Sequence, residues 1–242
     1  MKRLGSAHVL VVGVGGVGSW CAEALVRTGV GAITIMDDDL IAESNVNRQC
    51  PATSLTIGAP KTEAMKTRLL SINPNCIVNA RQERFERFNG LDGFSLVVDA
   101  IDSVNCKAEL ILGATEKGMP IVSSMGAALR TDPTKVVVRR FDKVEGDGLA
   151  RALRQRFKRL GRFPAAPFNC VCSTEPPAKL EDPAAKGSLM TVTATFGMCL
   201  ASESIKVLTS ATDLPRSSVF QELASKGDGD GLRAVCGAKL FI

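Results

Sequence analysis

The chain has 242 residues, of which 45% are hydrophobic and 23% charged, and its 30 Lys and Arg residues against 25 Asp and Glu residues give a net charge of +5. This composition is typical of a soluble globular protein and excludes an intrinsically disordered chain, a collagen-like fibre and a small disulfide-stabilised scaffold. The length suits one α/β domain with a large buried core, so we expect residues 1–242 to form a single domain.

Eight cysteines are scattered along the chain, and no basic and then apolar signal peptide precedes them. We therefore expect reduced thiols and a cytoplasmic protein. Two long uncharged stretches, residues 4–22 and 187–202, are interrupted by glycines or rich in Thr and Ser. Neither supplies the ~20 predominantly apolar residues that span a membrane, so we expect no membrane segment and a buried helix in the second stretch.

The first predicted elements alternate between strand and helix. Residues 8–13 are almost continuously apolar and end on glycine, which suits a strand buried on both faces of a parallel sheet. Apolar residues at helical spacing follow in residues 17–25, and Gly29 is placed to end that helix in a left-handed cap. Residues 32–36 form a second apolar run, so we expect two parallel strands joined by a helix.

The alternation continues to the end of the chain. The next predicted elements are a helix at 60–72, a strand at 76–80, a further strand that ends at Asp99, and a helix at 105–117. Strands at 120–124 and 135–141, a loop from Arg162 to 187 and a long helix to about 208 follow. This order predicts a doubly wound, Rossmann-like α/β fold whose mostly parallel sheet has helices on both faces. We expect a nucleotide-binding core at 7–142, with a basic helix, the loop and the last helix at 143–242.

A glycine-rich turn joins the first strand to the first helix, and its glycines are Gly13, Gly15, Gly16 and Gly18. Glycines let the backbone approach a phosphate, and the helix N-terminus supplies free N–H donors and a positive dipole. Asp37 ends the second strand, where a carboxylate can accept hydrogen bonds from ribose hydroxyls, and Asp39 is a further candidate ligand-binding residue. These residues predict an adenine-nucleotide site without separating ATP from NAD.

The next segment favours ATP. It contains Asn45, Arg48 and Gln49, and Lys61 follows in the sequence GAPK. A dinucleotide's pyrophosphate is served by the glycine turn, whereas additional cations suit a triphosphate. A surface ion pair is the alternative for Arg48 alone, but beside Lys61 and the polar residues we favour phosphate binding.

Two carboxylates, Asp99 and Asp102, occupy the end of the next predicted strand. Ligands bind at the carboxyl ends of strands in open sheets, and Asp102 could hold Mg²⁺ together with phosphate oxygens. The alternative is helix capping, since Asp102 and Ser103 are also suitable N-cap residues for the following helix. The two roles can coexist.

Four motifs follow one another along the chain. They are GxGGxGS from Gly13, DDDLIAESNVNRQ at 37–49, Lys61 in GAPK, and DAIDS from Asp99. In this order the chain resembles the ubiquitin-activating-like adenylyltransferases, the ThiF/MoeB/HesA family, which includes molybdopterin and thiamine biosynthesis enzymes. CVCSTE at 170–175 and TVTATFG at 191–197, with TDPT at 131–134, resemble the branch that dehydrates threonylcarbamoyladenosine in tRNA. The resemblance covers most of the chain.

The resemblance implies that ATP activates the threonyl carboxylate as an acyl-adenylate and that the neighbouring carbamoyl group closes a ring with loss of AMP. The second step is intramolecular, so it needs little beyond alignment and charge neutralisation. The implied cofactors are ATP and Mg²⁺, and the implied partners are tRNA, a second copy of the chain and, as in some relatives, sulfur-transfer proteins. The implied site residues are Asp37 for ribose, Asn45, Arg48 and Lys61 for phosphates, and Asp102 for Mg²⁺, with Arg48, Lys61 and Asp102 catalytic.

This chain differs from the family that it resembles in three features. The family usually has an N-terminal helical segment whose arginine reaches a partner subunit's phosphates, whereas this chain starts almost at its first strand, so either the gene model is truncated or that contribution is missing. Paired CxxC motifs for zinc are replaced by CVC at 170–172. Where some members have a reactive cysteine, the sequence reads EDP at 181–183, which argues against a covalent thioester step. Cys170, Cys172 or Cys236 could take the place of that cysteine, but we favour a buried or incidental thiol for each.

A basic segment, residues 151–162, has six cations and no acid. If it is helical, its apolar residues form one face and its cations another. A solvated helix face is the ordinary interpretation, but in a tRNA-modifying family a contact with the phosphate backbone is favoured. The predicted tRNA-binding residues are Arg151, Arg154, Lys158 and Arg159.

Three other functions stay open. The adenylated carboxylate could be the C-terminus of a ubiquitin-like sulfur carrier, the chain could be an NAD-dependent oxidoreductase, or it could be an inactive binding module. The single histidine, His8, lies where the first strand begins, so we interpret it as a strand-end residue and expect no catalytic imidazole.

Overall fold

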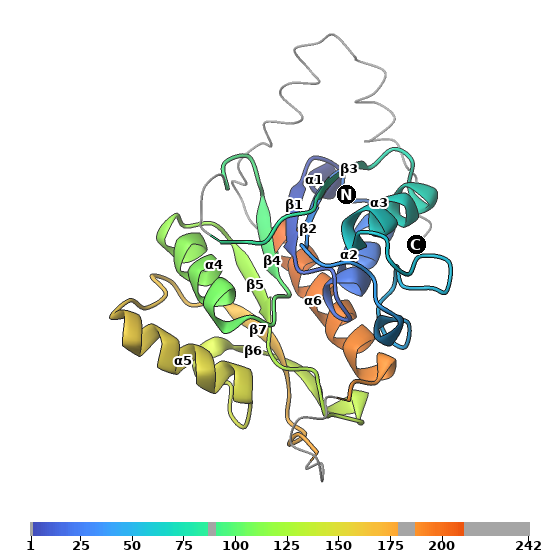
Figure 1. Ribbon diagram of the computed structural model, residues 1–242. Coiled ribbons are helices and arrows are strands. Elements are labelled where there is room, and N and C mark those ends of the chain that lie inside the picture. Colours follow the sequence, from blue (N-terminus) through green and yellow to red (C-terminus); the bar gives the residue numbers. More distant parts are fainter. Residues whose placement is uncertain (1, 87–90, 179–186, 211–242) are drawn as a thin grey trace.

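The computed structural model describes residues 2–86, 91–178 and 187–210. A seven-stranded sheet in the order β3-β2-β1-β4-β5-β7-β6 organises this part of the chain (Figure 1). The strands are β1 (His8–Val12), β2 (Ala32–Met36), β3 (Ile77–Arg81), β4 (Leu96–Asp99), β5 (Ile121–Ser124), β6 (Val136–Arg140) and β7 (Asn169–Ser173). The α-helices are α1 (Lys2–Gly5), α2 (Gly18–Arg27), α3 (Lys61–Ile72), α4 (Val104–Glu116), α5 (Gly148–Leu160) and α6 (Met190–Ser210).

Every neighbouring pair of strands is parallel except β6 and β7, which are antiparallel. All residues of the central strand β1 are buried, because β2 and β4 flank it and helices cover both its faces. Such strands read as continuous apolar runs, which is the pattern seen in the sequence. The predicted Rossmann-like α/β fold is confirmed.

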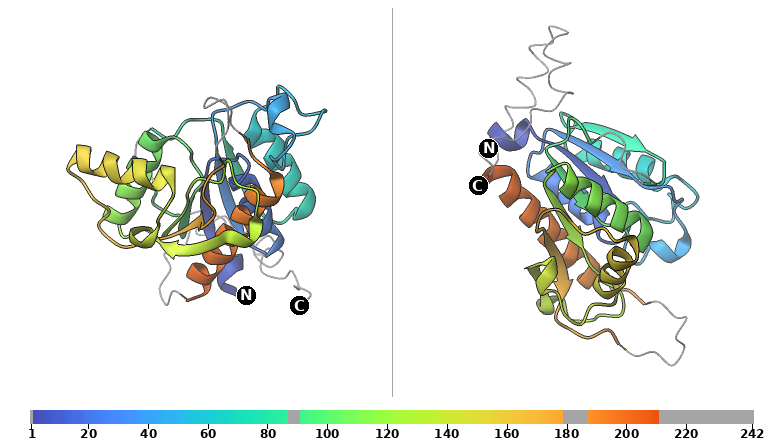
Figure 2. Two further views of the ribbon diagram at one scale, coloured as in Figure 1. Left: turned by 90° about the horizontal axis from the view of Figure 1, so that it is seen from below. Right: turned by 90° about the vertical axis from the view of Figure 1, so that its left-hand side faces the viewer.

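Two hydrophobic cores lie on opposite faces of the sheet, since successive side chains of a strand point to opposite sides. Val9 and Val11 of β1 belong to the core formed with α2, α3 and α6. Leu10 and Val12 belong to the core formed with α4 and α5. Figures 1 and 2 show α4 and α5 on one side of the sheet and α6 on the other. Both faces of the parallel sheet are therefore covered.

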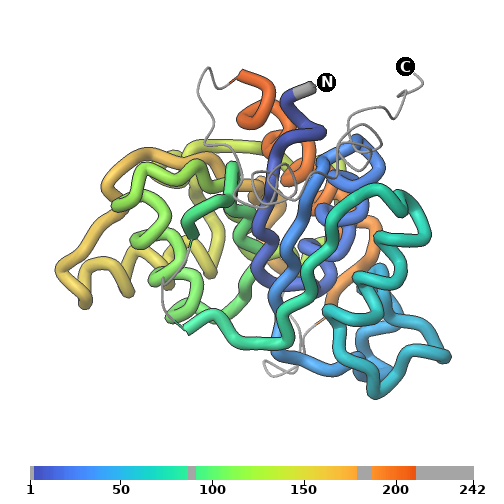
Figure 3. Tube along the Cα trace, turned by 90° about the horizontal axis from the view of Figure 1, so that it is seen from above, coloured from blue at the N-terminus to red at the C-terminus, as the bar shows by residue number. Residues whose placement is uncertain are grey.

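The last helix of the described residues, α6, returns to the first half of the chain and packs against α2 (Figure 3). Gly197 makes this contact possible. A Cβ atom there would lie 2.6 Å from the carbonyl oxygen of Val17 and 2.7 Å from Cβ of Trp20. Any larger residue would force α6 away from the glycine-rich turn, so the long uncharged stretch is a buried packing helix, as predicted.

Two elements were missed, namely the short helix α1 and the strand β7. The loop expected from Arg162 to 187 contains β7, which lies between β5 and β6 and is buried from Cys170 to Ser173. Cys170 and Cys172 fill the core under α4 and α5, and Val171 fills the opposite core. The strand was missed because cysteines, and not aliphatic residues alone, carry its apolar pattern. Residues 181–183 and Cys236 lie outside the described residues.

His8 starts β1, as predicted. Its Nε2 atom lies 2.8 Å from Oγ1 of Thr34, and its ring packs against Phe94 with ring centroids 4.4 Å apart. Burial, and to a lesser degree the charge of Arg81, lowers the pKa of His8 to about 4. None of the helices in the described part of the chain is long and apolar enough to cross a membrane.

Candidate nucleotide-binding site

A cleft of about 730 Å³ opens where β1, β2, β4 and β5 end. Ligands bind at this edge in open α/β sheets because the loops and helix N-termini meet there. The predicted residues that line it are Gly13, Gly15, Gly16, Asp37, Asp39, Asn45, Arg48, Gln49, Lys61 and Asp102. Of the predicted nucleotide- and metal-binding residues, only Gly18 is absent from the lining.

The glycines of the turn have different tasks. Gly13 has a φ of +90°, and a Cβ atom there would lie 2.6 Å from the carbonyl oxygen of Ala100. Gly18 would place a Cβ atom 1.9 Å from the carbonyl oxygen of Gly13. Both glycines therefore allow close backbone packing, whereas Gly15 faces open space with only a side-chain atom of Gln49 within 4 Å. A ligand can approach the backbone at Gly15.

Asp37 and Lys61 lie next to each other in the cleft lining. Asp37 accepts a 2.7 Å hydrogen bond from the N–H of Val14, so its carboxylate also fixes the glycine turn. The Nζ atom of Lys61 lies 2.6 Å from Oδ2 of Asp39 and 3.6 Å from Oδ1 of Asp37. Burial raises the pKa of Asp37 although Lys61 opposes this shift. Lys61 is thus a buried ammonium group, held at the first turn of α3 by two carboxylates.

The loop after β2 carries the other predicted phosphate ligands. The guanidinium of Arg48 donates to the carbonyl oxygen of Ser44 at 2.7 Å and to Oδ1 of Asn47 at 2.8 Å. Its aliphatic stem lies over Gly16, where a Cβ atom would be 3.2 Å from Cγ of Arg48. Asn45 lines the cleft and accepts a hydrogen bond from the N–H of Ala42, which stabilises the turn. The loop therefore lays the stem of Arg48 over the glycine turn, while the guanidinium is bonded to the loop itself.

Gln49 has an unusual side chain. It is 6% exposed and lines the cleft, and its Oε1 atom has no hydrogen-bond partner in the described structure. Buried polar atoms are normally satisfied, because leaving one unpaired costs about 1–3 kcal/mol. An unsatisfied atom at the wall of a cleft is consistent with a bound partner.

The Arg48 loop is anchored by a buried carboxylate that the sequence did not reveal. Glu23 of α2 accepts hydrogen bonds from Arg68 at 2.6 Å and from the thiol of Cys50 at 2.9 Å. Burial alone would raise the pKa of Glu23, but the hydrogen bonds from Arg68, Cys50 and Arg27 lower it to about 2. Burial and the contact with Glu23 raise the pKa of Cys50 to about 12. Cys50 is therefore a structural thiol that ties the loop to α2.

Asp102 is exposed at the end of the β4 segment and lines the cleft. Among the described residues its carboxylate has no hydrogen-bond or ion-pair partner, and the N-cap of α4 is Ser103, whose side chain makes no capping bond. The capping role predicted as an alternative is thus not seen. The structure leaves the Asp102 carboxylate available to a ligand.

Asp99 has turned inward instead. Its Oδ2 atom lies 2.8 Å from Nζ of Lys107 and accepts a 2.6 Å hydrogen bond from Ser123, and the Asp99 and Lys107 side chains are both 0% exposed. Lys107 also donates to the carbonyl oxygen of Ile101 at 3.0 Å. This buried pair fixes the backbone immediately before Asp102.

The charge balance of the cleft is acidic. Its lining has five carboxylates, from Asp37, Asp38, Asp39, Glu83 and Asp102, and three cations, from Arg48, Lys61 and Arg84. The oxygens of Asp37, Asp38 and Asp39 lie within 4.8 Å of one another. Arg84 was not predicted, although it follows the carboxyl end of β3, the position that singled out Asp37 and Asp102. A polyanion would enter this cleft more favourably with a cation than alone.

The basic segment forms α5, which begins at an Asp147 N-cap and ends at Gly161 with a φ of +62°. Arg151, Lys158 and Arg159 are exposed, while Leu153 and Phe157 are buried. Arg154 departs from the prediction. Its guanidinium donates to the carbonyl oxygens of Phe141 at 2.9 Å and Val144 at 2.6 Å and lies 5.0 Å from the centre of the Phe141 ring. Arg154 is therefore half-buried and holds α5 to the turn that follows β6.

The thiols of Cys170 and Cys172 lie inside the sheet and away from the cleft, because β7 buries them. Burial raises the pKa of both thiols. A thiol with a raised pKa is a poor nucleophile at neutral pH. These two cysteines therefore belong to the core.

Comparison with known proteins identifies relatives over most of the chain. The family described as the ThiF family matches residues 1–228. The tRNA threonylcarbamoyladenosine dehydratase of Haemophilus influenzae is 39% identical over 185 residues, covering 73% of this chain and 71% of that protein. The Escherichia coli protein of the same name is 36% identical over 240 residues, covering 85% of this chain and 87% of that protein.

The solved structures agree with the sequence matches. The crystal structure of the Escherichia coli dehydratase in complex with ATP superposes with a TM-score of 0.77 at 37% sequence identity. The superposition covers 86% of this chain and 88% of that one. The relative with this fold therefore holds ATP.

Proposed function

Because the chain belongs to the ThiF family, we propose that it uses ATP to dehydrate and cyclise N6-threonylcarbamoyladenosine in tRNA. The observation that carries this proposal is the pair of dehydratases that match at 39% and 36% identity over most of their length. The cleft supports it, since a glycine turn, Arg48, Lys61 and a free Asp102 carboxylate surround one space. ATP is the cosubstrate, as it is the ligand in the similar crystal structure.

The reaction needs two displacements. An oxygen of the threonyl carboxylate attacks the α-phosphorus of ATP, the bond to the bridging oxygen breaks, and pyrophosphate leaves. The carbamoyl group then attacks the acyl carbon, the bond to AMP breaks, and one proton passes to solvent. The carboxylate oxygen departs within AMP, so the nucleoside loses the elements of water. Neither step requires a protein nucleophile, which is consistent with a cleft that His8 does not line and in which Arg48 and Lys61 are cations.

We assign the residue roles from their places in the cleft. Asp37 binds the ribose hydroxyls, and Arg48, Lys61 and Asn45 bind phosphates as the charge on the leaving pyrophosphate develops. Preorganised cations that meet developing charge stabilise a transition state strongly. The glycine turn and the N-terminus of α2 bind phosphate oxygens through backbone N–H groups. Gln49 supplies an additional polar contact at the turn.

We propose Asp102 as the residue that holds Mg²⁺. The fit rests on two observations, namely that the carboxylate of Asp102 is unpartnered in the described structure and that the cleft lining has more carboxylates than cations. Magnesium would neutralise phosphate charge and is typically bound by one or two carboxylates plus phosphate oxygens. Asp102 would contribute such an oxygen ligand, with its backbone held in place by the pair of Asp99 and Lys107.

For tRNA we propose the exposed cations of α5, now reduced to Arg151, Lys158 and Arg159. Lysine and arginine on one helix provide a sequence-independent attraction to phosphates. Leu149, in the first turn of α5, lines the cleft. A tRNA bound along α5 would therefore lie next to the opening that receives its modified adenosine.

We further propose that the protein works in the cytoplasm as a homodimer. Val46, Leu189 and Met190 are 43%, 48% and 45% exposed. Asn47 donates to the carbonyl oxygen of Ser188, so the two segments that carry these apolar side chains are adjacent. A second copy is the occupant that we expect there. Light scattering should give twice the mass of one chain, and a monomer at micromolar concentration would contradict it. Sulfur-transfer proteins as partners stay a prediction from the family resemblance.

The decisive experiment is direct. Purified protein, ATP, Mg²⁺ and tRNA carrying threonylcarbamoyladenosine should give the cyclised nucleoside, detected by mass spectrometry after digestion. Pyrophosphate exchange into ATP should require this tRNA. Exchange supported instead by a ubiquitin-like carrier protein would favour the second candidate, adenylation of a carrier C-terminus. Tighter binding of NAD than of ATP would favour an oxidoreductase, and no exchange with any substrate would indicate an inactive binding module.

A further inference from the structure

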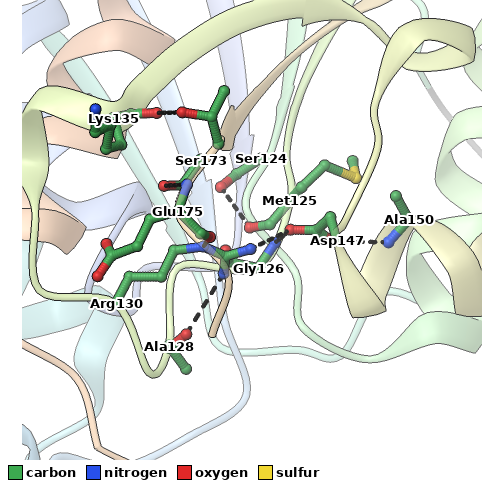
Figure 4. A network of polar contacts seen from close by, with 11 residues as sticks. Ser124, Met125, Gly126, Ala128, Arg130, Lys135, Asp147, Ala150, Ser173 and Glu175 are labelled. Carbon is green, nitrogen blue, oxygen red and sulfur yellow. Dashed lines mark hydrogen bonds and ion pairs between the residues drawn. The ribbon is translucent and has the colours of Figure 1, made fainter. Parts of the chain in front are cut away.

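A buried ion pair behind the cleft joins the cleft wall to the basic helix. The side chains of Arg130 and Asp147 are 3% and 0% exposed, and NH2 of Arg130 lies 3.1 Å from Oδ2 of Asp147 (Figure 4). Neither residue lines the cleft. The pair therefore stands outside the nucleotide-binding machinery and touches it only through other groups.

Arg130 belongs to the loop after β5 and stabilises it through hydrogen bonds to its backbone. Its NH1 atom donates to the carbonyl oxygens of Gly126 and Ala128, and its Nε atom donates to the carbonyl oxygen of Glu175 at 3.1 Å (Figure 4). Gly126 and Ala128 both line the cleft. One guanidinium thus sets the shape of a cleft wall and ties it to the end of β7.

Asp147 binds the same wall and also starts α5. One oxygen accepts the N–H of Gly126 at 3.1 Å, and the other accepts the N–H of Ala150 at 2.9 Å as the N-cap of the helix. An N-cap fixes where a helix begins and in which direction its first turn points. The position of the cleft wall and the direction of the basic helix therefore depend on one carboxylate.

Glu175 also fixes the loop that carries Arg130. Its carboxylate accepts the N–H groups of Thr131 and Asp132 at 3.1 and 3.0 Å, and the hydroxyl of Thr131 at 3.0 Å. Leu129, between these contacts and the cleft, has a φ of +60°, a conformation that non-glycine residues seldom adopt. The surrounding hydrogen bonds hold the loop in this conformation. Such over-determined loops are found where a wall must keep one shape.

We propose that Arg130 and Asp147 form a positioning pair that fixes the distance and angle between the cleft and helix α5, so that tRNA bound on α5 presents its acyl group to the nucleotide in one geometry. This inference rests on the proposed function. Buried ion pairs contribute little net stability compared with apolar residues, but they can specify a geometry. A misplacement of about 1 Å can cost on the order of 100-fold in rate.

The test uses Arg130→Lys, which keeps the charge beside Asp147 but cannot reach three carbonyl oxygens, because a lysine lacks the planar fork of arginine. Asp147→Asn is the second variant. The single carbonyl oxygen of asparagine can either cap the helix, as Oδ1 of Asp147 does, or accept from Gly126 and Arg130, as Oδ2 does, but it cannot do both. Arg140→Lys is the matched control, as Arg140 pairs with Asp142 on the surface with 57% and 49% exposed side chains. All three are compared with wild-type protein.

At saturating ATP and tRNA, we expect kcat for cyclisation to fall at least tenfold in Arg130→Lys and Asp147→Asn. The Kd values for ATP and tRNA should stay within about threefold, because the ligand-contacting residues are unchanged. A merely structural role would lower binding and turnover together. An unchanged kcat, or a parallel loss of both affinities, would overturn the proposal.

A second measurement does not depend on the reaction. Hydrogen exchange should show that AMP protects the loop at 125–129 and also the amides of Ala150 and Arg151 in wild-type protein and in Arg140→Lys. In both pair variants the protection should be confined to the loop. If wild-type protein shows this shared protection but converts no tRNA, the proposed function fails and the positioning pair stands. If AMP does not change the exchange of the Ala150 and Arg151 amides in wild-type protein, the proposal of a positioning pair is wrong, whatever the substrate of the enzyme is.

Discussion

The two sides of the cleft are built in different ways. On the side of β1, β2 and α3, the lining residues belong to short motifs, in which Asp37 accepts from Val14 and Lys61 pairs with Asp39. On the side of β5, the wall is held by Arg130, whose partners Asp147 and Glu175 come from distant segments. Local sequence therefore specifies the first side, and tertiary contacts specify the second.

The difference also concerns charge. The first side presents its cations to the cleft, whereas the second side buries its cation behind a wall of small residues, Gly126, Ala127 and Ala128. One side therefore suits a phosphorylated ligand, and the other suits shape and placement. Substitutions on the first side should therefore affect the chemistry at the phosphates, and substitutions on the second side should affect the placement of the ligands.

The largest expected effect comes from the buried pair of Asp99 and Lys107, which joins β4 to α4 between the two sides. Lys107→Met leaves a carboxylate buried and unpaired, and should lower the free energy of unfolding by about 3–5 kcal/mol. Chemical denaturation measures this change. The double variant Asp99→Asn with Lys107→Met should recover much of the loss, and a double variant no more stable than the single would contradict the assignment.

The next effect is catalytic and concerns the first side. Arg48→Ala or Lys61→Ala should lower kcat/KM for pyrophosphate exchange by about 10²–10³, the size expected when one preorganised group that stabilises developing charge is removed. Lys66→Ala is the matched control, because Lys66 lies on the same helix α3 but does not line the cleft. Equal exchange rates in Lys61→Ala and Lys66→Ala would remove Lys61 from the site.

A pH effect on the stability of the fold is expected from His8, the first residue of the central strand β1. His8 has a pKa of about 4 when folded, against 6.5 for an ordinary histidine, so the unfolded chain binds more protons between these values. Stability should therefore fall as the pH decreases from about 6.5 to 4, by at most about 1.4 kcal/mol per pH unit from this residue. Denaturation of wild-type protein and His8→Gln over this range measures the difference. Parallel stability curves would show that His8 does not titrate in this way.

The smallest effect should come from the second side, where α5 begins. Replacement of Arg151, Lys158 and Arg159 by alanine should weaken tRNA binding and reduce the slope of log Kd against log salt by about 0.7–0.9 for each phosphate that the variant no longer neutralises. Arg162→Ala is the control, since Arg162 is already paired with Glu116 at 2.9 Å. A slope equal to that of the control would exclude α5 as the tRNA surface.

Much of the fold could be predicted because buried parallel strands and amphipathic helices have their own periodicity. The strands β1 and β2 follow from apolar runs, and the glycine turn and Asp37 follow from where strands end. Strand β7 could not be predicted in the same way. Its burial depends on partners far along the chain, since Cys170 pairs with Ser123 on one side and Arg139 on the other.

The polar contacts of the site show the same limit. Asp102 was predicted from its position, but the inward turn of Asp99 depends on Lys107 and Ser123, which no local pattern associates with it. Arg154 was expected to face tRNA because its helical position is shared with other cations. Carbonyl oxygens of Phe141 and Val144 bind it instead. Helical spacing gives a face, but only the fold shows which cations on that face are free.

The close approach at Gly197 bears on how the protein is made. The glycine turn leaves the ribosome before α6 does, yet Thr193 of α6 borders the same cleft and Gly197 packs on Val17 beside it. A nascent chain that ends before α6 therefore has an open-sided cleft and an uncovered apolar face on its sheet. Completion of this pocket during synthesis must therefore wait for α6.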